Sequence, residues 1–305
     1  MIKLTFKQFR YFESLARLGH FGRAAEACAI SQPALSMQIK ELESALGLSL
    51  FERGSKEVRL TRFGEDFRLR ASNILRAVDE VEEFAQATRA DPIGRLRIGI
   101  IPTIAPYLLP RIIAPITALY RGVDLHIRET VTSKLIIELS GGSLDAAIVA
   151  LPILELAFTE TALFNESFVL VRPKAFADSP VPKIDALRAL RLLLLEEGHC
   201  FRDQALAFCN VKNTTPRERL DGSSLSTLVQ MVSSGIGVTL IPEMAIQVET
   251  RSAEVSLGRF SAPEPQRSIG MIWRKSNPMA QQFLQISDIV RCAGLTLLAE
   301  SPAFN

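Results

Sequence analysis

Cysteine, histidine and tryptophan are scarce in this sequence, and it has no long uncharged apolar run. The 305 residues include four cysteines, three histidines and one tryptophan. Four cysteines are too few for a disulfide-stabilised secreted scaffold, and a reducing compartment would keep them as thiols until an oxidant acted. No run of about 18 apolar residues is present to span a bilayer, and the first residues, MIKLTFKQFR, lack the apolar core of a secretory signal. These absences predict a cytoplasmic protein without membrane contact, in which any disulfide is conditional.

Residues that bind metals are equally sparse. His20 and His126 stand without neighbours of metal-ligating type. His199, Cys200 and Cys209 could offer three ligands, but an adjacent His–Cys pair rarely converges on one ion, and no fourth histidine or cysteine stands nearby. We therefore expect neither a metal nor a cofactor.

The composition is that of a globular chain with an uneven charge distribution. Hydrophobic residues make up 48% and charged residues 22%, enough for a full core and two domains. Residues 1–62 hold ten Lys and Arg against six Glu, giving +4, whereas the other 243 residues hold 25 basic against 27 acidic, giving −2. A basic end favours a polyanionic partner, although a solvated surface is an open alternative.

Three short helices are predicted at the basic end. Apolar residues recur at helical spacing over 6–16, Gly19 ends that helix, and a second helix follows within HFGRAAEACAI. In the third helix Ser31 is the N-cap, Pro33 lies in the first turn and Gly47 closes the end. Opposite its apolar stripe lie small, amide and basic side chains: Gln32, Ala34, Ser36, Gln38 and Lys40. Such a face suits the major groove, because Gln and Ser reach base edges while Lys holds phosphates.

The next stretch, LFERGSKEVRLTRFG, completes a winged helix-turn-helix pattern. Arg53 and Lys56 flank a glycine turn before a short alternating strand, as in a wing. With its AA-x(5)-SQPALS core and LFER ending, the region 4–65 resembles the N-terminal domain of LysR-type transcriptional regulators. The resemblance implies double-stranded promoter DNA as partner. It places five residues in the recognition helix: Gln32, Pro33, Ser36, Gln38 and Lys40. It assigns Arg53 and Lys56 to contacts with the DNA backbone. A helical module without DNA binding is the alternative.

A long helix is predicted next, over 63–91. Its apolar positions alternate steps of four and three, the spacing of a helix that pairs with another helix: Phe67, Ala71, Ile74, Val78, Val81, Ala85 and Thr88. Pro92 and Gly94 stop it. The pattern also fits a single helix lying on its own domain, but the linker helix of the LysR-type regulators favours a dimer. Two recognition helices could then sample successive major-groove faces.

From about residue 94 short β-rich runs alternate with helices, which predicts a doubly wound α/β domain. Helices are expected near 105–119 and 132–140. By resemblance this is a two-lobed, periplasmic-binding-protein-like sensor domain, with ligands at strand C-terminal ends between lobes. The whole is an α/β multidomain protein with these boundaries: 1–62 DNA-binding, 63–91 linker, 92–305 regulatory, with lobe I about 94–162 and 268–305 and lobe II about 163–267.

Half of the cysteines lie in one stretch, EEGHCFRDQALAFC, residues 196–209. The residues between Cys200 and Cys209 favour a helix, which would separate the two Cα atoms by roughly 13 Å and point them to opposite sides. A disulfide needs Cα atoms about 4.4–6.8 Å apart, so the thiols could bond only if the helix unwound. His199 and Arg202 could stabilise a Cys200 thiolate, whereas neighbouring acidic residues oppose it. Inert packing cysteines are the alternative.

A second resemblance bears on that choice. LLLLEEGHCFRDQALAFC and IGIIPTIAPYLLP are similar to the hydrogen-peroxide-sensing branch of the LysR-type regulators. The resemblance implies that Cys200 reacts with peroxide and that Cys209 is the resolving cysteine. Arg202, close to Cys200 in the sequence, is the expected stabiliser of the thiolate. It also implies the peroxide pocket: Thr103, Thr132, His199, Asp203 and Arg267. Each threonine could instead be a helix cap after a strand.

The leading hypothesis is therefore a DNA-binding regulator that hydrogen peroxide switches through a Cys200–Cys209 disulfide. The resemblance implies a homo-oligomer, a dimer of dimers, that activates antioxidant genes and contacts RNA polymerase. A LysR-type regulator that answers a small metabolite, with incidental cysteines, is the alternative. A third hypothesis is an enzyme, a thiol peroxidase. The fused DNA-binding domain argues against it, because peroxide turnover does not require binding to DNA.

Overall fold

The computed structural model describes residues 4–52, 58–87, 94–182, 186–187, 190–209, 221–262 and 264–301. The chain divides into two compact units, Met1–Arg89 and Ala90–Asn305. No helix within the described ranges combines the length and the apolar character that crossing a membrane requires.

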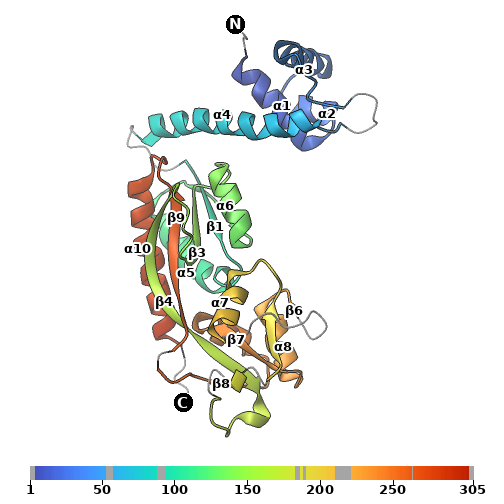
Figure 1. Cartoon of the computed structure of the whole chain (residues 1–305). Coiled ribbons are helices and arrows are strands. Elements are labelled where there is room, and N and C mark those ends of the chain that lie inside the picture. Colours follow the sequence, from blue (N-terminus) through green and yellow to red (C-terminus); the bar gives the residue numbers. More distant parts are fainter. Residues whose placement is uncertain are drawn as a thin grey trace. The chain divides into compact units, whose positions relative to one another are not determined.

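The first unit is helical (Figure 1). Its helices are α1 (Phe6–Leu18), α2 (Phe21–Ala27), α3 (Gln32–Leu46) and α4 (Arg62–Ala87). The predicted ends are confirmed: Gly19 and Gly47 close α1 and α3 in the left-handed conformation, at φ 62° and 69°. The hydroxyl of Ser31 accepts from the N–H of Ala34, and Pro33 stands in the first turn of α3. Local sequence signals thus fix the helix boundaries that frame the helix-turn-helix.

Part of the apolar stripe of helix α4 packs into the core of its own unit. Phe67, Ala71 and Leu75 are buried in the core of the first unit. Ile74 and Val81, two of the predicted dimer-seam positions, are 39% and 67% exposed. The start of α4 therefore follows the alternative of a helix on its own domain, and dimerisation through the exposed positions stays a prediction. In the predicted wing, residues 51 and 60 form an isolated antiparallel bridge, whereas Arg53 and Lys56 lie outside the described residues.

His20 caps α2 through its ring. Its Nδ1 accepts hydrogen bonds from the N–H groups of Gly22 and Arg23, at 3.0 and 3.4 Å. Replacing His20 by alanine is expected to lower the free energy of unfolding of the first unit by about 1 kcal/mol, because two helix-terminal donors lose their acceptor. Asparagine, whose side-chain oxygen can accept instead, should restore most of it. Thermal unfolding of both variants followed by far-UV circular dichroism checks this, and equal losses in both would contradict a capping role.

The second unit is a mixed α/β structure (Figure 1). Its strands are β1 (Arg95–Ile100), β2 (Asp124–Glu129), β3 (Ala146–Leu151), β4 (Phe158–Pro173), β5 (Leu192–Leu195), β6 (Asp221–Gly222), β7 (Val238–Pro242), β8 (Val255–Gly258) and β9 (Gln266–Arg274). Its helices are α5 (Ala105–Leu119), α6 (Thr132–Ser140), α7 (Cys200–Phe208), α8 (Leu225–Ser233), α9 (Ile246–Glu249) and α10 (Ala280–Ala299), with the 3-10 turns η1 (Lys174–Phe176) and η4 (Glu243–Ala245). The helices predicted near 105–119 and 132–140 are confirmed.

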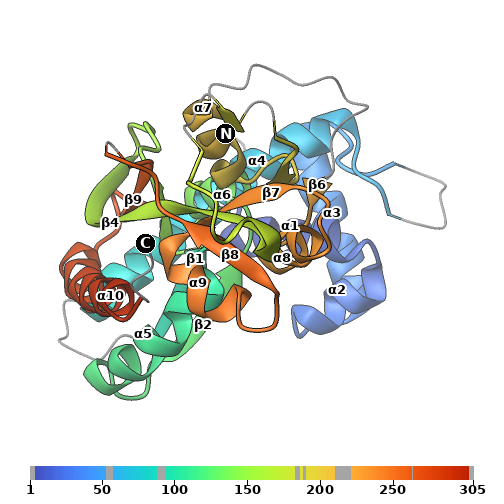
Figure 2. The ribbon, with the colours of Figure 1, turned by 90° about the horizontal axis from the view of Figure 1, so that it is seen from below.

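Strand pairing defines two lobes. The order is β2-β1-β3-β9-β4-β7-β5-β6, and β8 also pairs with β4. We call the part built on β2, β1, β3 and β9 lobe I, and the part built on β7, β5, β6 and β8 lobe II. Strand β4 belongs to both: residues 158–167 pair with β9, and residues 168–173 pair with β7 and β8. In lobe I, α5 and α10 lie side by side (Figure 2). Strand β3, AAIVAL, pairs with β1 in parallel and with β9 in antiparallel orientation, and it is buried along almost its whole length, as expected for a central strand covered on both faces.

A buried hydrogen-bond group also joins the lobes. The hydroxyl of Tyr107 in α5 donates to Glu249 in α9 at 2.6 Å, and Ser226 in α8 donates to the other oxygen of the same carboxylate at 2.5 Å. Burial, and then the Glu249 carboxylate, raise the pKa of Tyr107. The phenol therefore stays a hydrogen-bond donor at any physiological pH.

Candidate functional site

Helix α7 separates the two cysteines of the 196–209 stretch. Cys200 is its first residue and is half-buried, whereas Cys209 follows its last residue and is fully buried. The N–H of Cys209 bonds the carbonyl of Ala205 at 3.0 Å, so the helical turn continues up to that residue. Nine steps of 1.5 Å put the Cα atoms about 13.5 Å apart, beyond the reach of a disulfide. The predicted helix is confirmed, and the two thiols are unbonded to each other.

The first turn of α7 is anchored in the protein. Arg202 is 3% exposed, and one of its terminal nitrogens donates to the carbonyl of Leu195 at 2.5 Å and to Asp221 at 2.9 Å. Phe201 is also 3% exposed and lies beneath the guanidinium of Arg267, which is 5.2 Å from its ring centroid. The residues that follow Cys200 therefore tie it to lobe II through Arg202 and to β9 through Phe201.

Arg267 is the centre of a buried polar cluster. Its terminal nitrogens donate to the hydroxyl of Thr103 at 2.8 Å and to the Thr103 carbonyl at 3.0 Å. Its Nε donates to Glu166 at 2.7 Å, and both charged side chains are fully buried. Glu166 and Arg267 are cross-strand partners in the β4–β9 ladder. Two of the predicted pocket residues, Thr103 and Arg267, are thus brought into direct contact.

The sequence reading missed Glu166. A carboxylate in full burial must be paired, and here Arg267 supplies the opposite charge while the N–H of Met244 bonds its second oxygen at 3.3 Å. Burial raises the pKa of Glu166, and Arg267 offsets part of that rise. The available signal was a lone acidic residue just before the apolar run FVLVRP. Its partner lies 101 residues away, and only the strand register connects them.

The threonines do not cap helices, so that alternative is wrong. The N-cap positions of α5 and α6 are Ile104 and Val131, and neither helix has a side-chain cap. The Thr103 oxygen accepts from Arg267, which leaves its O–H as a donor to a further group. The Thr132 hydroxyl is buried without a hydrogen-bond partner among the described residues. Both hydroxyls therefore have hydrogen-bonding capacity to offer a small polar ligand.

The remaining predicted residues take different positions. His199 is the N-cap residue of α7 and is half-buried, and burial lowers its pKa. Asp203 is exposed in the first turn of α7, where its charge favours the helix N-terminus. The observed partners of Arg202 are Leu195 and Asp221, so its predicted contact with a Cys200 thiolate stays a prediction.

Comparisons with known proteins bear on both units. Residues 6–65 match the model of the bacterial regulatory helix-turn-helix protein, lysR family, and residues 89–291 match the LysR substrate binding domain. The chain belongs to the LysR family of transcriptional regulators.

Relatives place it within that family. It is 40% identical over 289 residues to the "Probable hydrogen peroxide-inducible genes activator" of Streptomyces viridosporus, covering 93% of this chain and 92% of that protein. It is 36% identical over 294 residues to the DNA-binding transcriptional dual regulator OxyR of Escherichia coli, covering 94% and 95%. Full-length OxyR of Pseudomonas aeruginosa with one cysteine replaced by aspartate matches with a TM-score of 0.77, 36% identity and 95% coverage of each chain. A hydrogen-peroxide-bound OxyR mutant of Corynebacterium glutamicum matches with a TM-score of 0.65, 33% identity and 99% and 97% coverage. The chain is a member of the OxyR group.

In this LysR-family chain the predicted recognition face is open. Gln32, Pro33 and Lys40 of α3 are exposed, and Ser36 and Gln38 are half-exposed. The opposite stripe is buried in the core of the first unit: Leu35, Ile39 and Leu42. The Gln38 amide donates to Glu41 at 2.8 Å, so a base contact by Gln38 would exchange that bond. Contacts of individual residues with DNA stay predictions.

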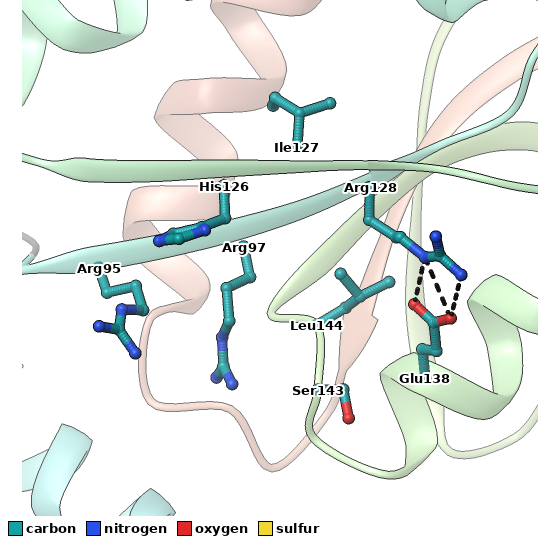
Figure 3. A pocket seen from close by; sticks show the side chains of 8 residues that line it. All are labelled: Arg95, Arg97, His126, Ile127, Arg128, Glu138, Ser143 and Leu144. Carbon is teal, nitrogen blue, oxygen red and sulfur yellow. Dashed lines mark hydrogen bonds and ion pairs between the residues drawn. The ribbon is translucent and has the colours of Figure 1, made fainter.

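A separate cavity lies in lobe I of this OxyR-group chain (Figure 3). It has a volume of about 300 Å³, and none of the residues predicted for the peroxide pocket lines it. Its three arginines each face a carboxylate: Arg95 with Asp124, Arg97 with Asp145, and Arg128 with Glu138. Because these charges are already paired, the cavity does not compete with the α7 region as a functional site. Within the described residues no cluster of three or more potential metal ligands is found.

The burial of Cys209 predicts that its thiol reacts slowly in this OxyR-group chain. Burial raises the pKa of Cys209 to about 11. At pH 8 only about one Cys209 in a thousand would be ionised, and alkylation requires the thiolate. Mass-mapped alkylation of the native reduced protein is expected to label Cys209 at least about a hundredfold more slowly than the exposed Cys292, and to label both equally after denaturation. Equal labelling in the native protein would contradict this.

Proposed function

We propose that this chain is a hydrogen-peroxide-sensing regulator that binds double-stranded promoter DNA and is switched by reversible disulfide formation between Cys200 and Cys209. The observation that carries the proposal is α7, which holds one thiol at each end in a chain of the OxyR group. A bond between the two sulfurs requires α7 to unwind, so formation of the disulfide is coupled to a conformational change of the sensor domain.

The chemistry divides into two steps. The Cys200 thiolate attacks one peroxide oxygen, an S–O bond forms, the O–O bond breaks, and the departing hydroxide takes up a proton as water. Cys209 then attacks the Cys200 sulfur as a thiolate, an S–S bond forms, and the hydroxyl leaves as a second water. Peroxide is reduced and the two thiols are oxidised.

The predicted pocket would place the peroxide for the first step. The Thr103 and Thr132 hydroxyls have donor capacity left, and Arg267 fixes the orientation of Thr103. His199 and Asp203 flank Cys200 on α7. Arg202 would support the thiolate.

The resemblance to the LysR-type regulators also supports a proposal for the domain roles and the assembly. We assign 1–62 to DNA binding, 63–91 to dimerisation and 92–305 to sensing, in a homo-oligomer built as a dimer of dimers. The protein would act in the cytoplasm on antioxidant genes and contact RNA polymerase. Nothing in this role requires turnover, so we class it as a regulator and not as an enzyme.

One experiment tests the proposal. Promoter DNA is footprinted with reduced protein, peroxide-treated protein and the Cys200→Ser variant, each mass-mapped for the disulfide. We expect an altered footprint and a Cys200–Cys209 bond only in the oxidised wild type. An absent bond or an unchanged footprint would overturn the proposal. A Cys200→Ser protein with a normal response would favour a metabolite as effector, and many peroxide turnovers per thiol would favour a peroxidase.

A further inference from the structure

Each cysteine of α7 has an aromatic neighbour inside the helix. Phe201 follows Cys200, and Phe208 precedes Cys209. The two rings meet different surroundings, so different contacts hold the two ends of α7.

The Cys200 end has several independent attachments. The Phe201 ring meets Phe168 edge to face at 4.9 Å and lies beneath the cation of Arg267. Arg202, the next residue, is buried in its contacts with Leu195 and Asp221. Releasing this turn would break an aromatic pair, a cation–π contact and an ion pair together.

The Cys209 end is attached through a different ring pair. Phe208 is half-buried, and among the described residues its ring contact is with Phe260, at 5.4 Å and an interplanar angle of 67°. Phe260 is 5% exposed and follows β8, so it belongs to the body of lobe II and not to α7. This ring pair and the burial of Cys209 therefore fasten the last turn of the helix to lobe II.

The second chemical step needs movement at that same end. Cys209 is fully buried, and its raised pKa keeps it protonated where it lies. The attacking species is the thiolate, so Cys209 must reach water. It must also cover most of the distance of about 13.5 Å that nine helical steps put between the two Cα atoms. Opening the last turn of α7 does both, while the anchored first turn keeps Cys200 in place.

We propose that Phe208 is a positioning residue for disulfide formation: its ring on Phe260 holds the last turn of α7 closed, and the parting of these two rings frees Cys209 to attack oxidised Cys200. This inference rests on the proposed function. It adds no reactant, because the Cys200–OH and Cys209 thiol give the disulfide and one water, as written above.

The test measures the two steps separately in the full-length protein. Rapid mixing with hydrogen peroxide and a dimedone-type sulfenic acid trap gives the rate of the first step. Acid quenching followed by mass mapping gives the rate of disulfide closure. In Phe208→Leu and in Phe260→Leu, closure is expected to accelerate about threefold to tenfold, the factor for losing one aromatic pair, with the first step unchanged. Leucine is the better helix former, so acceleration in Phe208→Leu would not come from a weaker helix.

Matched variants separate this role from general destabilisation. Phe208→Tyr keeps the ring and should close at the wild-type rate. Phe201→Leu changes the same residue type at the other end of α7 and should leave closure unaccelerated. Closure at the wild-type rate in Phe208→Leu, or equal acceleration in Phe201→Leu, would overturn the inference while the wild type still forms its disulfide. Failure of the wild type to form the bond would instead overturn the proposed function.

Discussion

Replacing Glu166 by alanine is expected to lower the free energy of unfolding of the sensor domain by about 3–5 kcal/mol. The variant leaves the fully buried guanidinium of Arg267 without its counter-charge. The only tryptophan of the chain, Trp273, lies in β9 and is 2% exposed, so its fluorescence in urea reports the sensor domain alone.

A double variant supplies the control for this prediction. With Glu166→Met and Arg267→Met together, no charge remains buried, and apolar side chains of similar length fill the space. Much of the lost stability should return, because a buried ion pair is often no more stabilising than apolar packing. Two results would contradict the prediction: a loss below about 1 kcal/mol in the single variant, or a double variant as unstable as the single one. Either would show that the unpaired charge of Arg267 is not what destabilises the single variant.

Replacing Cys209 by serine is expected to remove the reversibility of oxidation. Cys200 would still form its sulfenic acid, but the proposed resolving thiol would be missing, and excess peroxide would drive Cys200 to the sulfinic acid. Recovery of the Cys200 thiol by dithiothreitol after excess peroxide should fall from nearly complete to almost none. Mass spectrometry of the Cys200 peptide measures this recovery.

Two comparisons make that result specific. Cys292→Ser, at an exposed position on α10, should recover like the wild type. Full recovery in Cys209→Ser would mean that another group protects Cys200, and Cys209 would then have no resolving role.

The parts of the fold that local chemistry decides could be predicted from the sequence. The ends of α3 follow from Ser31 and Gly47, whose capping needs residues within one turn. The helix between the two cysteines likewise follows from the propensities of the residues between them. In contrast, the apolar stripe of α4 predicted a pairing helix but could not tell which positions its own domain would bury. Phe67 and Ala71 went inward, while Val81 stayed exposed.

Long-range pairing escaped the sequence reading. The full length of β4 is not encoded locally, because a bulge between Ala162 and Phe164 disturbs the alternation of the residues before the apolar run 168–173. The register of β4 against β9 also decides that Glu166 meets Arg267, which no local pattern encodes. The residues of the proposed peroxide pocket could therefore be predicted, but not their contacts with one another and with their neighbours. The contact of Arg267 with Phe201 is seen only in the folded chain.

The continuity of β4 limits how the sensor domain can move. Two-lobed binding proteins that close on a ligand bend at flexible connecting segments. Here a strand without interruption enters both lobes, and the Tyr107–Glu249 bond fastens them again beside it. Bending between the lobes would have to flex β4 itself and strain the buried Tyr107–Glu249 bond, so we expect the angle between the lobes to change little. We therefore expect a change that starts at α7 to alter the surface of lobe II, and to pass through that surface to the other subunits of the proposed oligomer.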